Sequence, residues 1–225
     1  MPWYTYMPKD LAIVLNNGSI NSAVTTALAA QRYRLVMLHI QCSAEAASRP
    51  RAAYEQQVAH FKPYREHLLA MPFLGTMVDD SAQNVGVDPR GGALSGRLVN
   101  LLPLVATAGR VAAFYQAVAV YLGLRVGPGA DDLAQATEYV QILNELLQLP
   151  CRQGELEVVA PILELERWQV VDVGFQVSVP FDRTWSCMEE QTDPCWACRG
   201  CRNREAAFQQ AAKPDPLRPI RPVRP

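Results

Sequence analysis

Apolar runs and amphipathic stretches alternate along this chain, and each kind of segment predicts one kind of secondary structure. Leu11–Leu15 and Arg34–Ile40 are short runs of strand length, and the first is apolar at every position, as in a strand covered on both faces. Ile20–Arg32, between them, is rich in alanine and predicts a helix. Strands and helices in alternation are typical of a parallel, doubly wound α/β sheet.

The alternation continues as far as residue 173. Further strands are expected at three positions: Gly75–Val78, Ala117–Leu124 and Leu156–Ile162. Further helices are expected at four positions: Pro50–Met71, Val99–Tyr115, Asp131–Leu149 and Leu165–Val173. Pro63 should kink or break the first of these helices, and Asp131 and Asp132 suit the N-terminus of the third. The polar, glycine-rich stretch Asp79–Gly96 predicts a loop.

The three histidines have no catalytic motif around them. His39 ends an apolar run, so we expect it to be buried with its hydrogen bonds satisfied. His60 and His67 are seven residues apart on the predicted helix Pro50–Met71, so they share a helix face, and we expect both to lie in solvent.

Composition and charge narrow the class of protein. The chain has 225 residues, of which 49% are hydrophobic and 19% are charged, as in a globular protein. Its net charge is −1, so no global basic field attracts nucleic acid or an anionic membrane. The most apolar region, Val99–Gly127, is interrupted by Pro103 and Arg110, and we do not expect it to span a bilayer. With no signal peptide recognised at the start, a cytoplasmic location is expected.

Four cysteines near the C-terminus are spaced as metal ligands. Cys187, Cys195, Cys198 and Cys201 are separated by seven, two and two residues. Each Cys-x-x-Cys turn points two thiolates at one centre, and four thiolates complete the tetrahedral shell of a structural zinc ion. A redox pair or an iron–sulfur cluster uses similar spacings and is the alternative. In a reducing compartment the cluster favours metal over disulfides.

The same region resembles a known family. The run Thr184-Trp185-Ser186-Cys187, the cysteine spacing, and the later Arg204 and Phe208 are similar to the end of the 7-cyano-7-deazaguanine synthases, members of the PP-loop ATP pyrophosphatase superfamily. Weaker similarity extends from Leu11 to Phe208. The resemblance implies a Rossmann-like sheet in residues 1–183, a zinc-bearing element in residues 184–212, and a homo-oligomer or a complex with a related protein. Active members use ATP to activate a carboxylate on a deazaguanine, take up ammonia and form a nitrile.

The resemblance places a phosphate loop directly after the first predicted strand. The family's Ser-Gly-Gly-x-Asp-Ser matches Asn17-Gly18-Ser19-Ile20-Asn21-Ser22 here. A strand, a tight turn and a helix N-terminus together favour an anion. The second glycine has become Ser19, and the acid suited to magnesium has become the neutral Asn21. We therefore expect a remnant nucleotide loop in which the binding of ATP with magnesium is compromised.

Two further family motifs are reduced or absent. A Pro-x-Arg-Asn element survives only as Arg97, the last candidate for the nucleotide site. The substrate-side motif falls on Asp131–Ala136, where none of its residues remains. Two hypotheses follow: a catalytically degenerate member that acts by binding a partner or an active relative, or an active ATP-dependent enzyme that converts a carboxylate on a 7-deazaguanine, or on a related substrate, to an amide and a nitrile.

The last segment, residues 213–225, is rich in proline and arginine. Arg-Pro recurs with a period of three, at Arg218, Arg221 and Arg224. A polyproline-II helix has three residues per turn, so these arginines would lie along one edge of an extended tail. The tail is expected either to dock in an acidic, aromatic-lined groove of a partner or to serve as a spacer.

Overall fold

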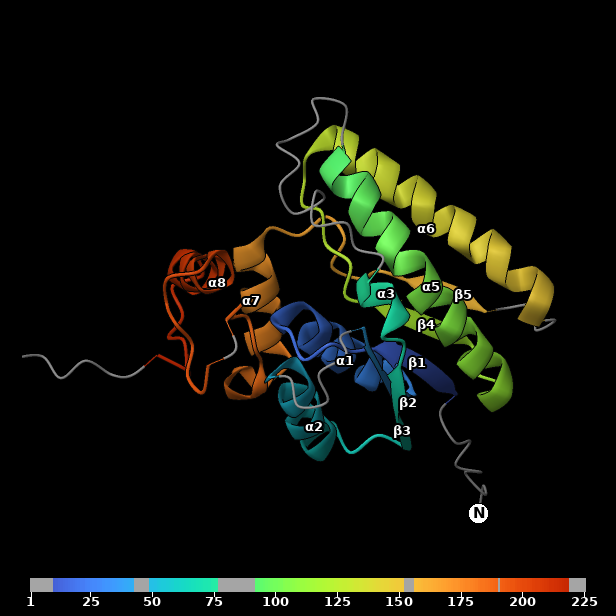
Figure 1. Ribbon diagram of the computed structural model, residues 1–225, viewed down its shortest axis with the longest axis horizontal. Coiled ribbons are helices and arrows are strands. Elements are labelled where there is room, and N and C mark those ends of the chain that lie inside the picture. Colours follow the sequence, from blue (N-terminus) through green and yellow to red (C-terminus); the bar gives the residue numbers. More distant parts are fainter. Residues whose placement is uncertain (1–9, 43–48, 77–91, 152–155, 190, 219–225) are drawn as a thin grey trace, which may run out of the picture.

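The computed structural model describes residues 10–42, 49–76, 92–151, 156–189 and 191–218 of the chain. Within these ranges, a parallel sheet of five strands occupies the centre of the molecule, in the order β3-β2-β1-β4-β5 (Figure 1). The strands are β1 (Leu11–Leu15), β2 (Arg34–Gln41), β3 (Arg65–Ala70), β4 (Ala119–Leu122) and β5 (Glu157–Val159). The parallel α/β sheet expected from the sequence is therefore confirmed.

Helices cover both faces of this sheet. They are α1 (Ile20–Arg32), α2 (Arg49–Phe61), α3 (Phe73–Thr76), α5 (Gly92–Tyr115), α6 (Ala130–Cys151), α7 (Arg167–Gln176) and α8 (Arg199–Gln210), with a short 3-10 helix η1 (Phe181–Arg183). α5 and α6 run side by side over one face (Figure 1), and α1 and α2 cover the other. α7 packs on the outside of α1, and α8 packs on α7.

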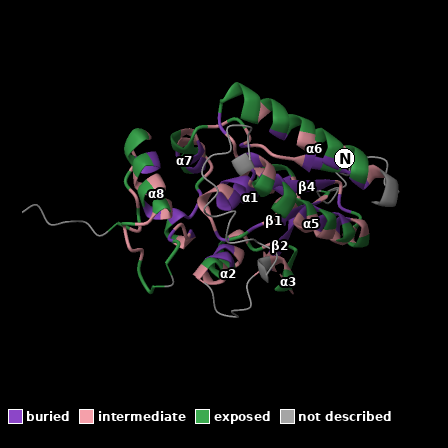
Figure 2. Cartoon of the chain, turned by 45° about the horizontal axis from the view of Figure 1, so that its top comes forward, coloured by how far each residue is buried: buried purple, intermediate pink, exposed green. Residues whose placement is uncertain are grey.

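Burial follows these layers. The strands β1 and β4 are buried along most of their length, and the outward face of α6 is exposed (Figure 2). Leu94–Tyr115 of α5 is long and apolar enough to cross a membrane by length and composition alone. It is a core helix, because one of its faces packs in the largest hydrophobic cluster through Leu94, Leu98, Val105, Ala108 and Ala112.

The long helix predicted at Pro50–Met71 is wrong in its second half. α2 ends at Phe61, Lys62 takes a left-handed backbone conformation with φ of 48°, and Pro63 follows. Proline has no N–H to continue the helix, so Pro63 ends it rather than kinking it. The next residues form β3, an edge strand that pairs in parallel with β2. His67 therefore lies in a strand, where its Nε2 is 2.7 Å from the Tyr115 hydroxyl, and is not free in solvent.

Two smaller expectations also differ from the structure. Gly75 and Thr76 belong to the short helix α3 instead of a strand, and residues 77–78 lie outside the described residues. Of the predicted loop Asp79–Gly96, residues 79–91 lie outside the described residues, and the rest already forms the start of α5. Glycine-rich sequence favours a loop, but the apolar residues Leu94 and Leu98 pack on the core and stabilise helix here. Asp131 and Asp132 do stand in the first turn of α6, as predicted.

Candidate functional site

The loop between β1 and α1 has the tight turn that the sequence predicts. Ser19 caps α1, and its Oγ accepts a hydrogen bond from the Ser22 N–H at 3.4 Å. Gly18 has φ of +79°, a backbone conformation that is unfavourable for residues with a side chain. In addition, a Cβ at this position would overlap the carbonyl oxygen of Pro50. The turn therefore needs glycine at position 18, both for its backbone angle and for the close approach of α2.

A buried polar network holds this loop in place. The Asn16 amide nitrogen donates to Gln57 Oε1 at 2.8 Å and to Thr26 Oγ1 at 3.0 Å, and its oxygen accepts from the Gly18 N–H at 2.8 Å. Gln57 Nε2 in turn donates to the Gly18 carbonyl at 3.1 Å and to the Arg183 carbonyl at 2.9 Å. Asn16 and Gln57 are buried, so both amides act as internal braces. Neither residue belongs to a motif that marks it in the sequence.

The Asn17 side chain occupies part of the anion-binding face of the loop. Its Oδ1 accepts from the Ser19 N–H at 3.2 Å and from the Ser22 hydroxyl at 3.0 Å. These are groups that a phosphate oxygen would otherwise engage at the start of a helix. An anion reaching the loop therefore competes with the amide oxygen of Asn17.

A cavity of about 360 Å³ opens beside the loop, at the carboxyl ends of β1, β2 and β4. We call it the loop cavity. Asn17, Ser19, Asn21 and Ser22 line one wall, and Arg97 from α5 lines another. Ligands of open parallel sheets bind at this edge of the sheet. His39 lies below the loop, buried, with Nδ1 2.9 Å from the Asn16 carbonyl, so the expected buried and satisfied histidine is confirmed.

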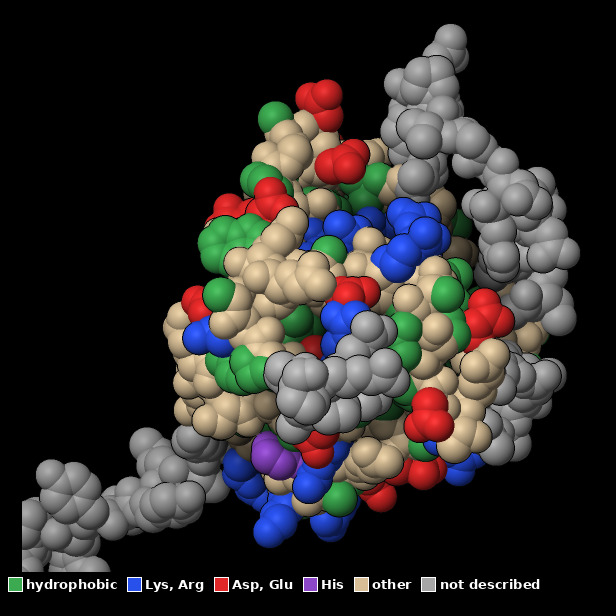
Figure 3. Space-filling view, turned by 90° about the vertical axis from the view of Figure 1, so that its left-hand side faces the viewer, with side chains coloured by type: hydrophobic (Ala, Val, Ile, Leu, Met, Phe, Trp, Pro, Cys, Tyr) green, Lys and Arg blue, Asp and Glu red, His purple; other side chains and the backbone are tan. Residues whose placement is uncertain are grey.

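Arginines gather next to the loop. Arg97 Nη2 donates to the Arg125 carbonyl at 2.8 Å, and Arg125 Nη1 donates to the Leu165 carbonyl at 3.1 Å. Arg125 and Arg167 line a second cavity of about 220 Å³, the arginine cavity, and Asn21 lines both cavities. Figure 3 shows basic side chains gathered on the face of the molecule that carries α7 and α8.

Nearby carboxylates compensate the charges of these arginines only in part. Partial burial lowers the pKa of Arg97 and of Arg125, and the neighbouring positive charge of Arg167 lowers both further. Asp132 and Glu166 act in the opposite direction on Arg97 and Arg125, respectively, but neither forms an ion pair with them among the described residues. The arrangement favours a bound anion.

Magnesium, which the family resemblance implies, does not fit these walls. Proteins hold magnesium through one or two carboxylates together with the phosphates of the substrate. In the described part of the chain, neither the loop cavity nor the arginine cavity is lined by an aspartate or a glutamate. Asn21 contributes only a neutral amide at the position where the family has an aspartate.

The four predicted zinc ligands do converge. The Sγ atoms of Cys187, Cys195, Cys198 and Cys201 all lie within 4.8 Å of one another. Two pairs of sulfurs are 3.9 Å apart, and tetrahedral zinc with Zn–S bonds of about 2.3 Å requires about 3.8 Å. The donor set therefore fits a structural zinc ion.

Backbone geometry supports this metal site. The Met188 and Cys201 N–H groups donate to Cys198 Sγ, both at 3.4 Å, and these hydrogen bonds, the Met188 bond foremost, lower the pKa of that thiol to about 6. Burial raises the pKa of the Cys201 thiol, a preference that a coordinated cation would override. A Cβ on Gly200 would overlap the Ser186 carbonyl, so the second turn also needs a glycine.

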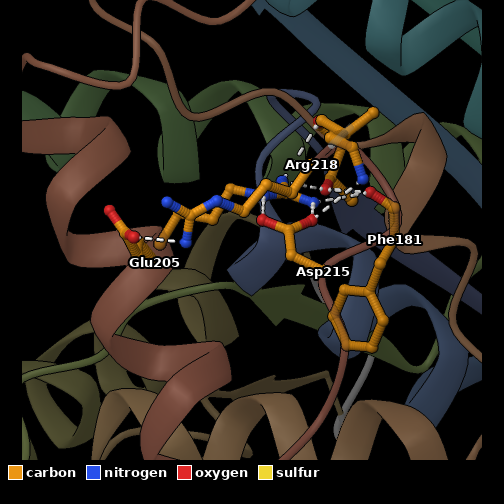
Figure 4. Close-up of polar contacts among 7 residues, drawn as sticks. Phe181, Glu205, Asp215 and Arg218 are labelled. Carbon is orange, nitrogen blue, oxygen red and sulfur yellow. Dashed lines mark hydrogen bonds and ion pairs between the residues drawn. The ribbon is translucent and has the colours of Figure 1, made fainter. Parts of the chain in front are cut away.

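A buried ion pair fastens the C-terminal segment to α8 of the metal-binding element (Figure 4). Arg204 donates from Nε and Nη2 to the two carboxylate oxygens of Asp215, at 2.7 and 2.8 Å, with the two side chains 2% and 5% exposed. Arg204 also donates to Thr184 Oγ1 at 2.7 Å and to the Phe181 carbonyl at 3.0 Å. One guanidinium thus joins η1, α8 and the C-terminal segment.

Of the tail predicted to be extended from residue 213, the structure describes residues 213–218, and these include a turn. Asp215–Arg218 forms a turn in which the Arg218 N–H donates to the Asp215 carbonyl at 3.1 Å. Arg218 forms an ion pair with Glu205 and lies 5.7 Å from the centre of the Trp196 ring. The buried Arg204 draws this segment onto α8, which a proline pattern alone could not reveal. Residues 219–225 lie outside the described residues, and their docking to a partner stays a prediction.

The structure also brings the predicted nucleotide residues together. Asn17, Ser19, Asn21, Ser22 and Arg97 line the loop cavity, and Gly18 supplies its turn. Their role in nucleotide binding stays a prediction. Arg125 was missed because no family motif marks it; its position after β4, at the carboxyl edge of the sheet, is the signal that could have found it.

Comparison with known proteins agrees with the family resemblance seen in the sequence. A family model described as "Queuosine biosynthesis protein QueC" matches residues 11–212. The chain is 23% identical over 217 residues to the 7-cyano-7-deazaguanine synthase of Aliarcobacter butzleri, covering 92% of this chain and 94% of that protein. It is 28% identical over 239 residues to the 7-cyano-7-deazaguanine synthase of Synechococcus sp. (strain CC9311), and the match covers 96% of this chain and 100% of that protein.

Solved structures include more distant neighbours. The U34-tRNA thiolase NcsA from Methanococcus maripaludis is 15% identical to this chain, with a TM-score of 0.47. The match covers 90% of this chain and 64% of the NcsA chain.

Proposed function

Because the chain belongs to the QueC family, we propose that it is an ATP-dependent enzyme that acts on the carboxylate of a 7-deazaguanine, or of a related substrate, and forms the amide and then the nitrile. The observation that carries the proposal is the loop cavity, which is open, lies at the ligand-binding edge of the sheet and has Arg97 among its lining residues. Its volume of about 360 Å³ is in the range of small-molecule sites.

The residues of this cavity suit the activation of a carboxylate. ATP would lie with its phosphates toward the α1 N-terminus, whose dipole favours negative charge. Arg97 can hold an anionic group on the facing wall through paired N–H donors. A carboxylate oxygen then attacks the α-phosphorus, a P–O bond forms, and the bond to pyrophosphate breaks. Apolar residues from the edge of the sheet and from α5 form much of the remaining wall: Leu15, Leu38, Ile40, Leu101, Leu104, Leu122 and Leu124.

A second candidate function is binding without turnover, to a partner or an active relative. One observation favours it: Asp131–Ala136, where the family has its substrate-recognition motif, forms the first turns of α6, is exposed at four of its six positions and includes none of the family's residues. The Asn17 amide oxygen, which accepts from the Ser19 N–H and the Ser22 hydroxyl, also favours this second candidate.

The test is an assay of the purified, zinc-loaded chain with ATP, ammonium and a 7-deazaguanine carboxylate. We expect AMP to form only when the carboxylate is present, with amide or nitrile as the second product. Arg97→Met should reduce the rate, and Arg110→Met, an exposed arginine on the same helix, serves as the control. ATP binding without AMP would favour the second candidate, and no ATP binding would contradict the first.

A further inference from the structure

The phosphates of ATP bring a charge that this site must neutralise. Pyrophosphate and the β,γ-phosphates of ATP carry several negative charges, and metal ions usually bridge them in ATP-dependent enzymes. Here the two cavities that meet at Asn21 have no described carboxylate to hold such an ion. The described walls of these two cavities offer guanidinium groups, and no carboxylates, to the phosphates.

Arginine supplies the neutralising charge in the arginine cavity. Arg125 and Arg167 line it together with Ser19 and Asn21, so the cavity adjoins the N-terminus of α1. The Arg125 guanidinium is held by the Leu165 carbonyl at 3.1 Å, and Arg167 begins α7. The scaffold therefore holds the Arg125 guanidinium in place, and the start of α7 brings the backbone of Arg167 to the same cavity.

These guanidinium groups repel one another when the cavity is empty of anions. Arg97 adjoins Arg125 through the 2.8 Å hydrogen bond to its carbonyl. Among the described residues, no carboxylate forms an ion pair with Arg97, Arg125 or Arg167. Arg204, which also lines the cavity, is already neutralised by Asp215. An anion with several oxygens would remove the repulsion and could accept paired N–H groups from more than one arginine.

We propose that Arg125 and Arg167 form a polyphosphate site that needs no magnesium, and that the pyrophosphate leaving group occupies the arginine cavity while the reacting carboxylate and α-phosphate lie in the loop cavity. This inference rests on the proposed function for the identity of the ligand. In the step described above, the bridging oxygen leaves with pyrophosphate and takes the bonding electron pair, so the added charge appears beside the arginines.

The experiment is calorimetric titration of the full, zinc-loaded chain with inorganic pyrophosphate. Magnesium-free buffer without chelator keeps the zinc in place, and a parallel titration contains magnesium. We expect pyrophosphate to bind in both, with no loss of affinity when magnesium is absent. Arg125→Met and Arg167→Met should each weaken binding about 10-fold or more, the effect of losing one charge-assisted contact.

Arg110→Met is the matched control, because Arg110 is an exposed arginine on α5 that does not line either cavity. Arg167 is exposed as well, so its replacement tests the site even if Arg125→Met fails to fold. Binding that requires magnesium, the absence of binding, or variants that bind as tightly as the control would each overturn the proposal.

The two proposals can fail separately. Magnesium-dependent formation of AMP without pyrophosphate binding in magnesium-free buffer would retain the proposed activity and refute the arginine site. Pyrophosphate binding that depends on Arg125, in a protein that forms no AMP, would support the arginine site and refute the proposed activity.

Discussion

Replacing Asp215 by asparagine tests whether the buried ion pair fastens the C-terminal segment. The exchange keeps the shape of the side chain but removes its charge, and it turns one accepting oxygen into an NH₂ donor that faces guanidinium N–H groups. Arg204 would keep its bonds to Thr184 and Phe181, at 2.7 and 3.0 Å, and would remain buried without a counter-charge.

The structure gives the expected size of this effect. Breaking one partner of a buried pair costs about 3–5 kcal/mol, and the lower end applies if residues 213–218 detach and admit water. For a chain of this length about 3 kcal/mol corresponds to about 6–12 °C in melting temperature. Thermal denaturation of zinc-loaded Asp215→Asn should show this loss, and deletion of residues 213–225 should reproduce it.

Glu205→Gln provides the matched control. It removes the ion pair with Arg218, whose side chains are 25% and 42% exposed, and such pairs contribute about 1 kcal/mol or less. Equal melting temperatures for Asp215→Asn and Glu205→Gln would show that the buried ion pair does not fasten the C-terminal segment. The tail would then be a spacer from residue 213 onward.

Three further predictions concern the metal site and the loop. Cys195→Ser should lose the zinc, which elemental analysis should find at about one per chain in the parent protein, and should lower the melting temperature; iron with sulfide instead of zinc would contradict this. Gly18→Ala should lower the free energy of unfolding in urea by about 2 kcal/mol or more, because φ is +79° and the added Cβ would overlap Pro50. The control Gly96→Ala should not destabilise the chain, because no described atom lies within 4 Å of its Cβ. The double substitution Ser19→Gly and Asn21→Asp would place a carboxylate beside both cavities. It should therefore raise the affinity for ATP with magnesium and weaken the binding of pyrophosphate in magnesium-free buffer. Calorimetry that shows neither change would count against the magnesium-free site.

Local sequence was enough for the first strand and helix and for the metal ligands. β1 and α1 have the predicted bounds, because a continuous apolar run and a capped, alanine-rich stretch leave little choice of structure. The four cysteines converge because two Cys-x-x-Cys turns fix their local geometry.

Long-range contacts decided what the sequence could not. Arg65–Ala70 contains good helix formers and is only half covered, so pairing with β2, not propensity, makes it an edge strand. The bond between Asn16 and Gln57 joins residues 41 positions apart, and a buried glutamine on a helix leaves no periodic signal. The pairing of Arg204 with Asp215 likewise depends on how α8 packs.

We propose that the loop cavity supports ATP-dependent activation of a carboxylate. The most direct measurement is AMP formation by the zinc-loaded chain supplied with ATP, ammonium and a 7-deazaguanine carboxylate. We expect AMP formation that requires the carboxylate and that falls in Arg97→Met but not in Arg110→Met. A protein that binds ATP but yields no AMP above the Arg97→Met variant would contradict it.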